Sequence, residues 1–114
     1  MWIASTNGFI SIVQHWDKPD TLLVRARVRK DLLSIFSELR IIEIPNADYR
    51  FRVLVSKNEF AELMFNQVMG IDYPNFKNRI ATSDSQKDKL DIYHQIWSIM
   101  FNYAKRLRYG KSQL

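Results

Sequence analysis

The chain has 114 residues, of which 46 % are apolar and 13 % aromatic, so it can build a packed core and is too hydrophobic for a disordered chain. It contains no cysteine, which excludes disulfide bonds, zinc–thiolate sites and a cysteine nucleophile. Its formal net charge is +5, but residues 1–104 carry 13 basic and 12 acidic side chains. We therefore expect a nearly neutral folded body followed by a basic tail over about 105–114.

The length predicts a single domain over residues 1–114. The first residues lack the basic and apolar regions of a signal peptide, and no apolar run reaches the ~20 residues that span a bilayer. We expect a cytoplasmic protein that has no membrane partner.

The chain begins with two extended runs, Trp2–Thr6 and Phe9–His15, which are separated by Asn7-Gly8. This dipeptide is a strong hairpin signal, because a type I′ turn needs a positive φ at both central residues. The sequence therefore predicts a tight antiparallel hairpin with its turn at Asn7-Gly8. Trp16, in the charged turn that follows, is predicted to be exposed.

An alternating segment, Thr21–Lys30, follows the hairpin. Apolar side chains alternate there with Arg25, Arg27 and Arg29, which is the period-two pattern of a half-buried strand. The segment Tyr49–Val55 repeats the pattern with Arg50 and Arg52. Two arginine-bearing strands are therefore predicted, with a short extended segment, Arg40–Ile44, between them.

Three segments have helical spacing. A helix over Asp31–Leu39 is predicted from one apolar stripe, and the capping box of Ser56 and Glu59 predicts a helix that ends at Gly70. A short helical turn follows the Asp72–Lys77 segment. The last helix is predicted from about Gln86 to about Tyr109, and its predicted buried face consists of Leu90, Tyr93, Trp97, Met100 or Phe101, and Ala104.

The order of these elements predicts an α+β fold, with a mostly antiparallel sheet of four to five strands and helices packed on one face. The repeated unit of an arginine strand and a helix suggests a ferredoxin-like split βαβ topology as one arrangement.

An arginine-rich sheet face is the first candidate site, formed by Arg25, Arg27, Arg29, Arg50 and Arg52. Guanidinium groups at this spacing bind phosphates or carboxylates in a bidentate manner. The alternative is that these arginines solvate an open sheet face and pair with Glu43 and Asp48. The two readings differ in whether the charges are free for a ligand.

A second candidate site combines Tyr73, Lys77 and His94. The first two lie in the segment Asp72–Lys77, and Asp91 precedes His94 by three residues, so that a carboxylate could orient an imidazole. The alternative is a capped corner beside a surface helical pair. No metal-ligand spacing, P-loop or glycine-rich dinucleotide motif is present, so we expect no metal and no cofactor.

Several short motifs are spread over nearly the whole chain: Met1-Trp2, Asn7-Gly8-Phe9, Val24–Arg27, Asp48–Arg52, Asp72–Lys77, Tyr93-His94 and Trp97. Together they resemble a family of small uncharacterised bacterial proteins. The resemblance implies a stand-alone small domain and no particular activity.

The leading hypothesis for function is a non-enzymatic module that presents an arginine-rich face to an anionic partner, which is a nucleic acid, a nucleotide or an acidic protein. One alternative is a small metal-independent nuclease or nucleotide-processing enzyme. Another is a homo-oligomeric regulatory or structural subunit, such as a homodimer.

Overall fold

The computed structural model describes residues 1–109, and within them the chain folds into two compact units. The first unit is Met1–Pro74, and the second begins at Asn75. The predicted basic tail falls partly on residues 110–114, which lie outside the described residues. No described helix is long and apolar enough to cross a membrane. The prediction of one domain stays a prediction.

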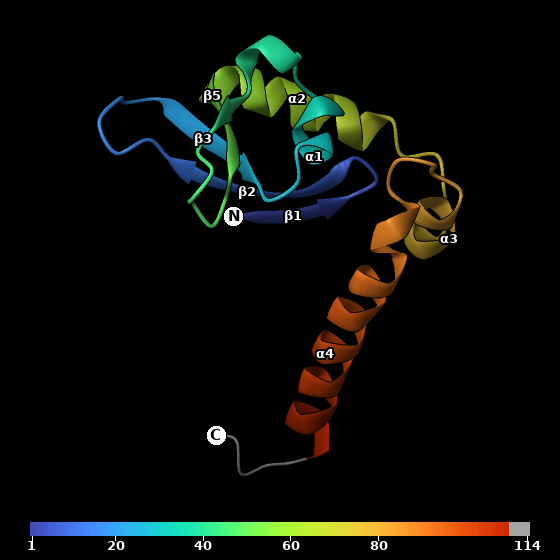
Figure 1. The fold of residues 1–114 in the computed structure, drawn as a ribbon. Helices are drawn as coiled ribbons and strands as arrows, with labels where there is room; N and C mark the ends of the chain where they lie inside the picture. The colour runs from blue at the N-terminus through green and yellow to red at the C-terminus, as the bar shows by residue number, and fades with distance from the viewer. Residues whose placement is uncertain (110–114) are drawn as a thin grey trace. The chain divides into compact units, whose positions relative to one another are not determined.

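The first unit is built on a five-stranded sheet in the order β1-β2-β3-β5-β4 (Figure 1). Its strands are β1 (Trp2–Ser5), β2 (Gly8–Gln14), β3 (Thr21–Ala26), β4 (Ile42–Glu43) and β5 (Phe51–Ser56). Every neighbouring pair is antiparallel. The predicted α+β class is therefore confirmed, whereas a split βαβ topology, which needs a parallel pair, is not what these strands form.

One face of the sheet carries the core of the first unit. Side chains alternate between the two faces along each strand. The even-numbered residues of β2 and β3 and the odd-numbered residues of β5 point to this face. The buried cluster joins three strands to the two helices: Ile10, Ile12, Val24, Ala26, Val53 and Val55 from the sheet, and Leu32, Phe36 and Phe60 from the helical side. The helices α1 and α2 lie on this same side (Figure 1). The other face is left without a helix from this unit.

The helix predicted over Asp31–Leu39 is wrong in length. The α-helix α1 covers only Lys30–Leu33, and a separate 3-10 turn, η1, covers Glu38–Arg40. The hydroxyl of Ser37 accepts the amide of Leu39 and so starts this turn. Leu32 and Phe36 still reach the core, but Leu39 is 97 % exposed.

The predicted N-cap, Ser56, is confirmed at α2 (Lys57–Met69), whereas the carboxylate of Glu59 binds Arg40. The hydroxyl of Ser56 accepts the amide of Glu59 at 3.0 Å, and Gly70 ends the helix. Phe60 is buried and Leu63 and Met64 pack against the core. The prediction that Val68 faces inward is wrong, since its side chain is 63 % exposed.

The second unit contains α3 (Phe76–Ala81), the 3-10 turn η2 (Lys87–Lys89) and α4 (Leu90–Tyr109). The side chain of Asn75 caps α3 by accepting the amide of Asn78 at 2.9 Å. The aromatic ring of Phe76 packs on that of Tyr93, with centroids 5.3 Å apart. Tyr93 is the buried residue of α4, so the prediction that Trp97, Met100 and Ala104 are also buried is wrong for the described residues.

The first hairpin is shifted by one residue from the predicted turn. Ser5 pairs with Gly8, so the two turn residues are Thr6 and Asn7, and Gly8 begins β2. Gly8 has a φ of +139°, and a Cβ placed there would lie 2.6 Å from the carboxyl carbon of Asp31. The buried Asp31 carboxylate also accepts the amide of Phe9 at 3.2 Å. Gly8 therefore serves the close approach of α1 to the hairpin as well as the turn.

Replacing Gly8 with alanine should lower the free energy of unfolding by more than about 1 kcal/mol, because the new Cβ meets Asp31 and φ stays positive. Urea denaturation followed by circular dichroism measures this. The matched control is Gly70→Ala, since Gly70 has an ordinary φ of −87° and a looser contact of 3.2 Å. Equal effects of the two changes would contradict the role assigned to Gly8.

Candidate functional site

The structure separates the five predicted arginines into two groups. Arg25, Arg27 and Arg52 gather around Tyr49, and Arg29 and Arg50 lie over the ring of Phe51. The strand β3 ends at Ala26, so Arg27 and Arg29 belong to the bend that follows it. The prediction of a regular strand to Lys30 is wrong, because the chain must turn there to enter α1.

Three of the five arginines are neutralised by carboxylates. Arg27 binds Asp48 in a bidentate manner, with both nitrogen–oxygen distances 3.0 Å. Glu43 lies between Arg29 and Arg50, at 3.1 Å and 2.6 Å. For Arg27, Arg29 and Arg50 the structure thus shows the alternative interpretation of the sequence. In that interpretation Asp48 and Glu43 are the counter-charges.

The ion pairs shift the pKa values of their members. The hydrogen bond from Arg50 is the main cause that lowers the pKa of Glu43, and Arg29 adds to it. The hydrogen bond to Asp48 raises the pKa of Arg27. In the same way, the hydrogen bond between Arg40 and Glu59 raises the pKa of Arg40 and lowers that of Glu59. These exposed pairs fix the loops around the sheet edge more than they stabilise the whole fold.

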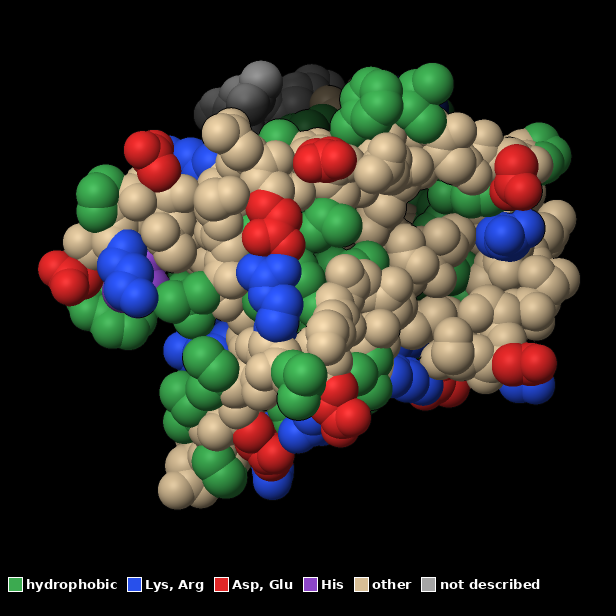
Figure 2. Space-filling view, turned by 90° about the horizontal axis from the view of Figure 1, so that it is seen from above, with side chains coloured by type: hydrophobic (Ala, Val, Ile, Leu, Met, Phe, Trp, Pro, Cys, Tyr) green, Lys and Arg blue, Asp and Glu red, His purple; other side chains and the backbone are tan. Residues whose placement is uncertain are grey.

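Charge balance extends over the whole first unit. Residues 1–74 contain nine basic and nine acidic side chains, so their net charge is zero. Figure 2 shows basic and acidic side chains intermixed over the visible face, without a large area of one sign. The net charge of +5 therefore comes from residues 75–114, which carry eight basic and three acidic side chains.

Arg25 and Arg52 are the exceptions to the pairing of arginines with carboxylates in the first unit. They lie directly opposite each other on β3 and β5, on the sheet face that α1 and α2 leave open. Like charges in directly opposed positions repel. Among the described residues neither has a carboxylate partner, which distinguishes them from the other four arginines of the first unit.

Each of these two guanidinium groups is partly satisfied by neutral acceptors. Arg25 donates to the buried hydroxyl of Ser11 at 2.8 Å, and Arg52 donates to the carbonyl of Tyr49 at 3.0 Å. The Nε atom of each is buried and has no hydrogen-bond partner. An unsatisfied buried donor costs about 1–3 kcal/mol, and more when it is charged. Such unsatisfied donors are rare in folded proteins and call for an explanation, such as a bound water or ion.

The ring of Tyr49 packs against one member of the arginine pair, Arg25, and against Arg27. It is only 9 % exposed and lies 4.4 Å from the guanidinium carbon of Arg25 and 4.2 Å from that of Arg27. A guanidinium that stacks on an aromatic face keeps its edge free for an acceptor. Tyr49 therefore orients Arg25 without neutralising it.

Apolar side chains border the arginine pair on the same face. The adjacent row of the sheet consists of Val13, Leu23 and Leu54, which are directly opposed on three strands. The row of the arginines itself ends in Trp2 on β1 and Ile42 on β4, both exposed. The surroundings thus suit an anionic group that is attached to an apolar or aromatic body.

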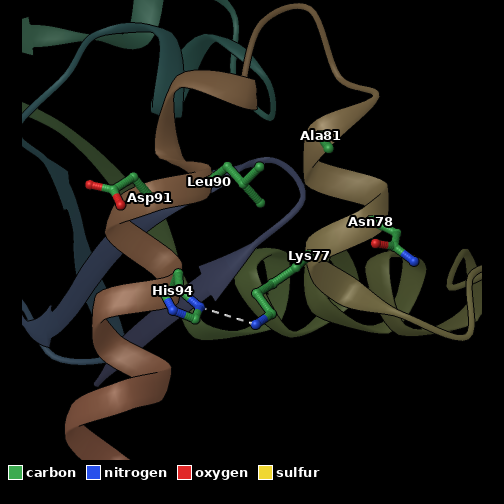
Figure 3. A pocket seen from close by; sticks show the side chains of 6 residues that line it. All are labelled: Lys77, Asn78, Ala81, Leu90, Asp91 and His94. Carbon is green, nitrogen blue, oxygen red and sulfur yellow. Dashed lines mark hydrogen bonds between the residues drawn. The ribbon is translucent and has the colours of Figure 1, made fainter.

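The second unit carries the other candidate residues, Lys77 and His94. The Lys77 ammonium lies 3.2 Å from His94 Nδ1 and 4.8 Å from the ring centre of Trp97. Since an ammonium group only donates, Nδ1 accepts in this contact. Figure 3 shows Lys77 reaching from α3 toward His94 on α4, above an open hollow of about 430 Å³ that Asn78, Ala81, Leu90 and Asp91 also line.

The predicted pairing of the Asp91 carboxylate with the His94 imidazole is not formed. The Asp91 carboxylate accepts the amide of Gln95 at 2.8 Å, and Figure 3 shows it on the side of α4 away from Lys77. Tyr73 belongs to the first unit, where it is half-buried. Within residues 1–109 no group of three histidine, aspartate or glutamate side chains could hold a metal ion.

Some residues of the sites were not identified from the sequence. Ser11 and Tyr49 complete the arginine pair, and only the strand register could have placed them there. His15, outside both sites, accepts the amides of Asp17 and Lys18 at 3.0 Å and so caps the turn after β2. Trp16, which stacks on this imidazole, is 81 % exposed as predicted.

No family model, no curated protein and no solved structure matches this chain.

Glu43→Gln should make stability less dependent on pH. A carboxylate with a lowered pKa in the folded state stabilises the fold fully above its ordinary pKa of about 4.3, and this contribution is lost as the pH falls through the lowered value. The variant should therefore be less stable than the parent at neutral pH and equal to it at strongly acidic pH. Urea titrations over a pH series measure this, with Glu62→Gln on the exposed side of α2 as the control. A pH dependence unchanged by Glu43→Gln would contradict the role of this ion pair.

Proposed function

We propose that this protein is a non-enzymatic binding module that takes a single anionic group, a phosphate or a carboxylate, on the open face of its sheet. The observation that supports this proposal is the pair Arg25 and Arg52, which are opposed in register and each have a buried, unpartnered Nε atom. Two neighbouring guanidinium groups that lack a carboxylate partner can bind such an anion through charge-assisted hydrogen bonds.

The surrounding charges favour one anionic group over an extended polyanion. A nucleic-acid backbone needs several unpaired cations along its path, since its affinity comes from neutralising successive phosphates. In the first unit, Arg27, Arg29 and Arg50 are already bound by carboxylates. We therefore infer a ligand whose anionic group sits on the arginine pair, with its apolar part along the half-buried Leu54.

The geometry offers no catalytic group at this position. The residues that contact the arginine pair are Ser11 and Tyr49, and the hydroxyl of Ser11 is buried as an acceptor for Arg25. Neither histidine is in contact with the arginine pair, since His15 caps a turn and His94 contacts Lys77. Binding without turnover is the function that these contacts support best.

The test is a binding titration with pyrophosphate, a short oligo-thymidine and a glutamate-rich peptide, followed by calorimetry over a salt series. Arg25→Gln and Arg52→Gln should each weaken binding of the preferred anion by about tenfold or more, since each removes a charge-assisted hydrogen bond. Arg27→Gln is the matched control, because Asp48 already occupies that guanidinium, and its effect should be small.

Circular dichroism of each variant shows whether the sheet remains folded. Equal losses in all three variants would indicate a diffuse charge effect and would contradict a specific arginine pair. Binding of none of the three probes by the parent protein would contradict an anion site on this face. The steepness of the salt dependence separates one anionic contact from many.

A further inference from the structure

The helix α4 exposes a row of large apolar side chains along one side. The row consists of Ile92, Ile96, Ile99 and Tyr103, with exposed fractions between 39 % and 66 %. Met100 and Leu107 border it and are also exposed. Isolated apolar residues on a surface are ordinary, whereas a continuous row of this length marks an interaction surface.

The spacing of this row is that of a helix–helix seam. Its members follow each other at intervals of four, three and four residues, which keeps them on one side of an α-helix. The polar side of α4 carries Gln95, Ser98 and Asn102 instead. Because isolated helices depend on packing of their apolar side for stability, this row requires a partner.

The other helix of the second unit does not supply that partner. The short helix α3 contacts α4 through Phe76 on Tyr93 and through Lys77 on His94 and Trp97. At 100° per residue, these three positions on α4 lie on a different side from Ile92, Ile96 and Ile99. The isoleucine row is thus separate from the hollow described above.

We propose that the isoleucine row of α4 binds the same row of a second copy of this chain, with the two helices antiparallel. In this arrangement Ile96 packs on Ile99 of the second copy, and Ile92 packs on its Tyr103. Each contact then occurs twice about a two-fold axis, as a symmetric dimer requires.

The distribution of charge supports this occupant and this direction. Residues 92–109 contain Lys105, Arg106 and Arg108 and no acidic residue, whereas residues 84–91 contain three acidic and two basic ones. A parallel pair would bring both strongly basic ends together. An antiparallel pair places each basic end beside residues 84–91 of its partner, whose net charge is −1, and keeps the two Arg106 positions about 25 Å apart, beyond the screening length of about 8–10 Å.

The first measurement is sedimentation equilibrium of the complete chain over a concentration series. The expected result is a species with twice the 13.6 kDa of one chain. The double variant Ile96→Asp/Ile99→Asp should shift the protein to a single-chain mass. Ser98→Asp, on the polar side of the same helix, is the matched control and should leave the dimer intact.

The direction of the helices is tested with a nitroxide label at Arg106→Cys, which is a unique site because the chain has no cysteine. Pulsed dipolar spectroscopy should then give a distance close to that of the antiparallel arrangement, whereas a parallel pair would give a much shorter one. If the aspartate variants do not fold, hydrogen exchange of the parent protein replaces them, and amides 92–103 should become more protected as the concentration rises.

A single-chain mass at every concentration would overturn the proposal. A dimer that survives the double variant in folded form would also overturn it, since the dimer would then use another surface. A short label distance would overturn the antiparallel direction.

Discussion

The alternation along β3 is the constraint on which the rest of the first unit depends. This strand is the middle one of five, and it pairs with β2 on one side and β5 on the other. Val24 and Ala26 are completely buried under the helices, which sends Arg25 to the opposite face. A shift of register by one residue would place guanidinium groups in the core, so the hydrophobic pattern also fixes the position of the arginine.

The same constraint explains why two arginines differ from the others. Arg25 and Arg52 lie within paired strands, where the register sets their neighbours and brings no carboxylate to them. Arg27, Arg29 and Arg50 lie in the segments that flank the strands, where loops can bring Asp48 and Glu43 to them. The regular part of the sheet thus holds unpaired charge and the irregular part neutralises it.

The sequence was sufficient for features that depend on local pattern. The alternation of β3 up to Ala26, the Ser56 N-cap of α2 and the exposure of Trp16 follow from neighbouring residues, and the structure confirms them. The position of the first turn could not be predicted, because Gly8 is required by Asp31, which lies 23 residues away. The arginine pair could not be predicted either, because it depends on residues far apart in the sequence. Only the neighbouring positions of β3 and β5 in the sheet bring Arg25 opposite Arg52.

The most direct test observes the buried donors themselves. In proton–nitrogen NMR spectra of the arginine side chains, titration with pyrophosphate should shift the Nε–H signals of Arg25 and Arg52, because these two atoms lack an acceptor in the free protein. The Nε–H signals of Arg27 and Arg50, which donate to Asp48 and Glu43, should remain in place. Equal shifts of all arginine signals, or none, would contradict an anion site formed by Arg25 and Arg52.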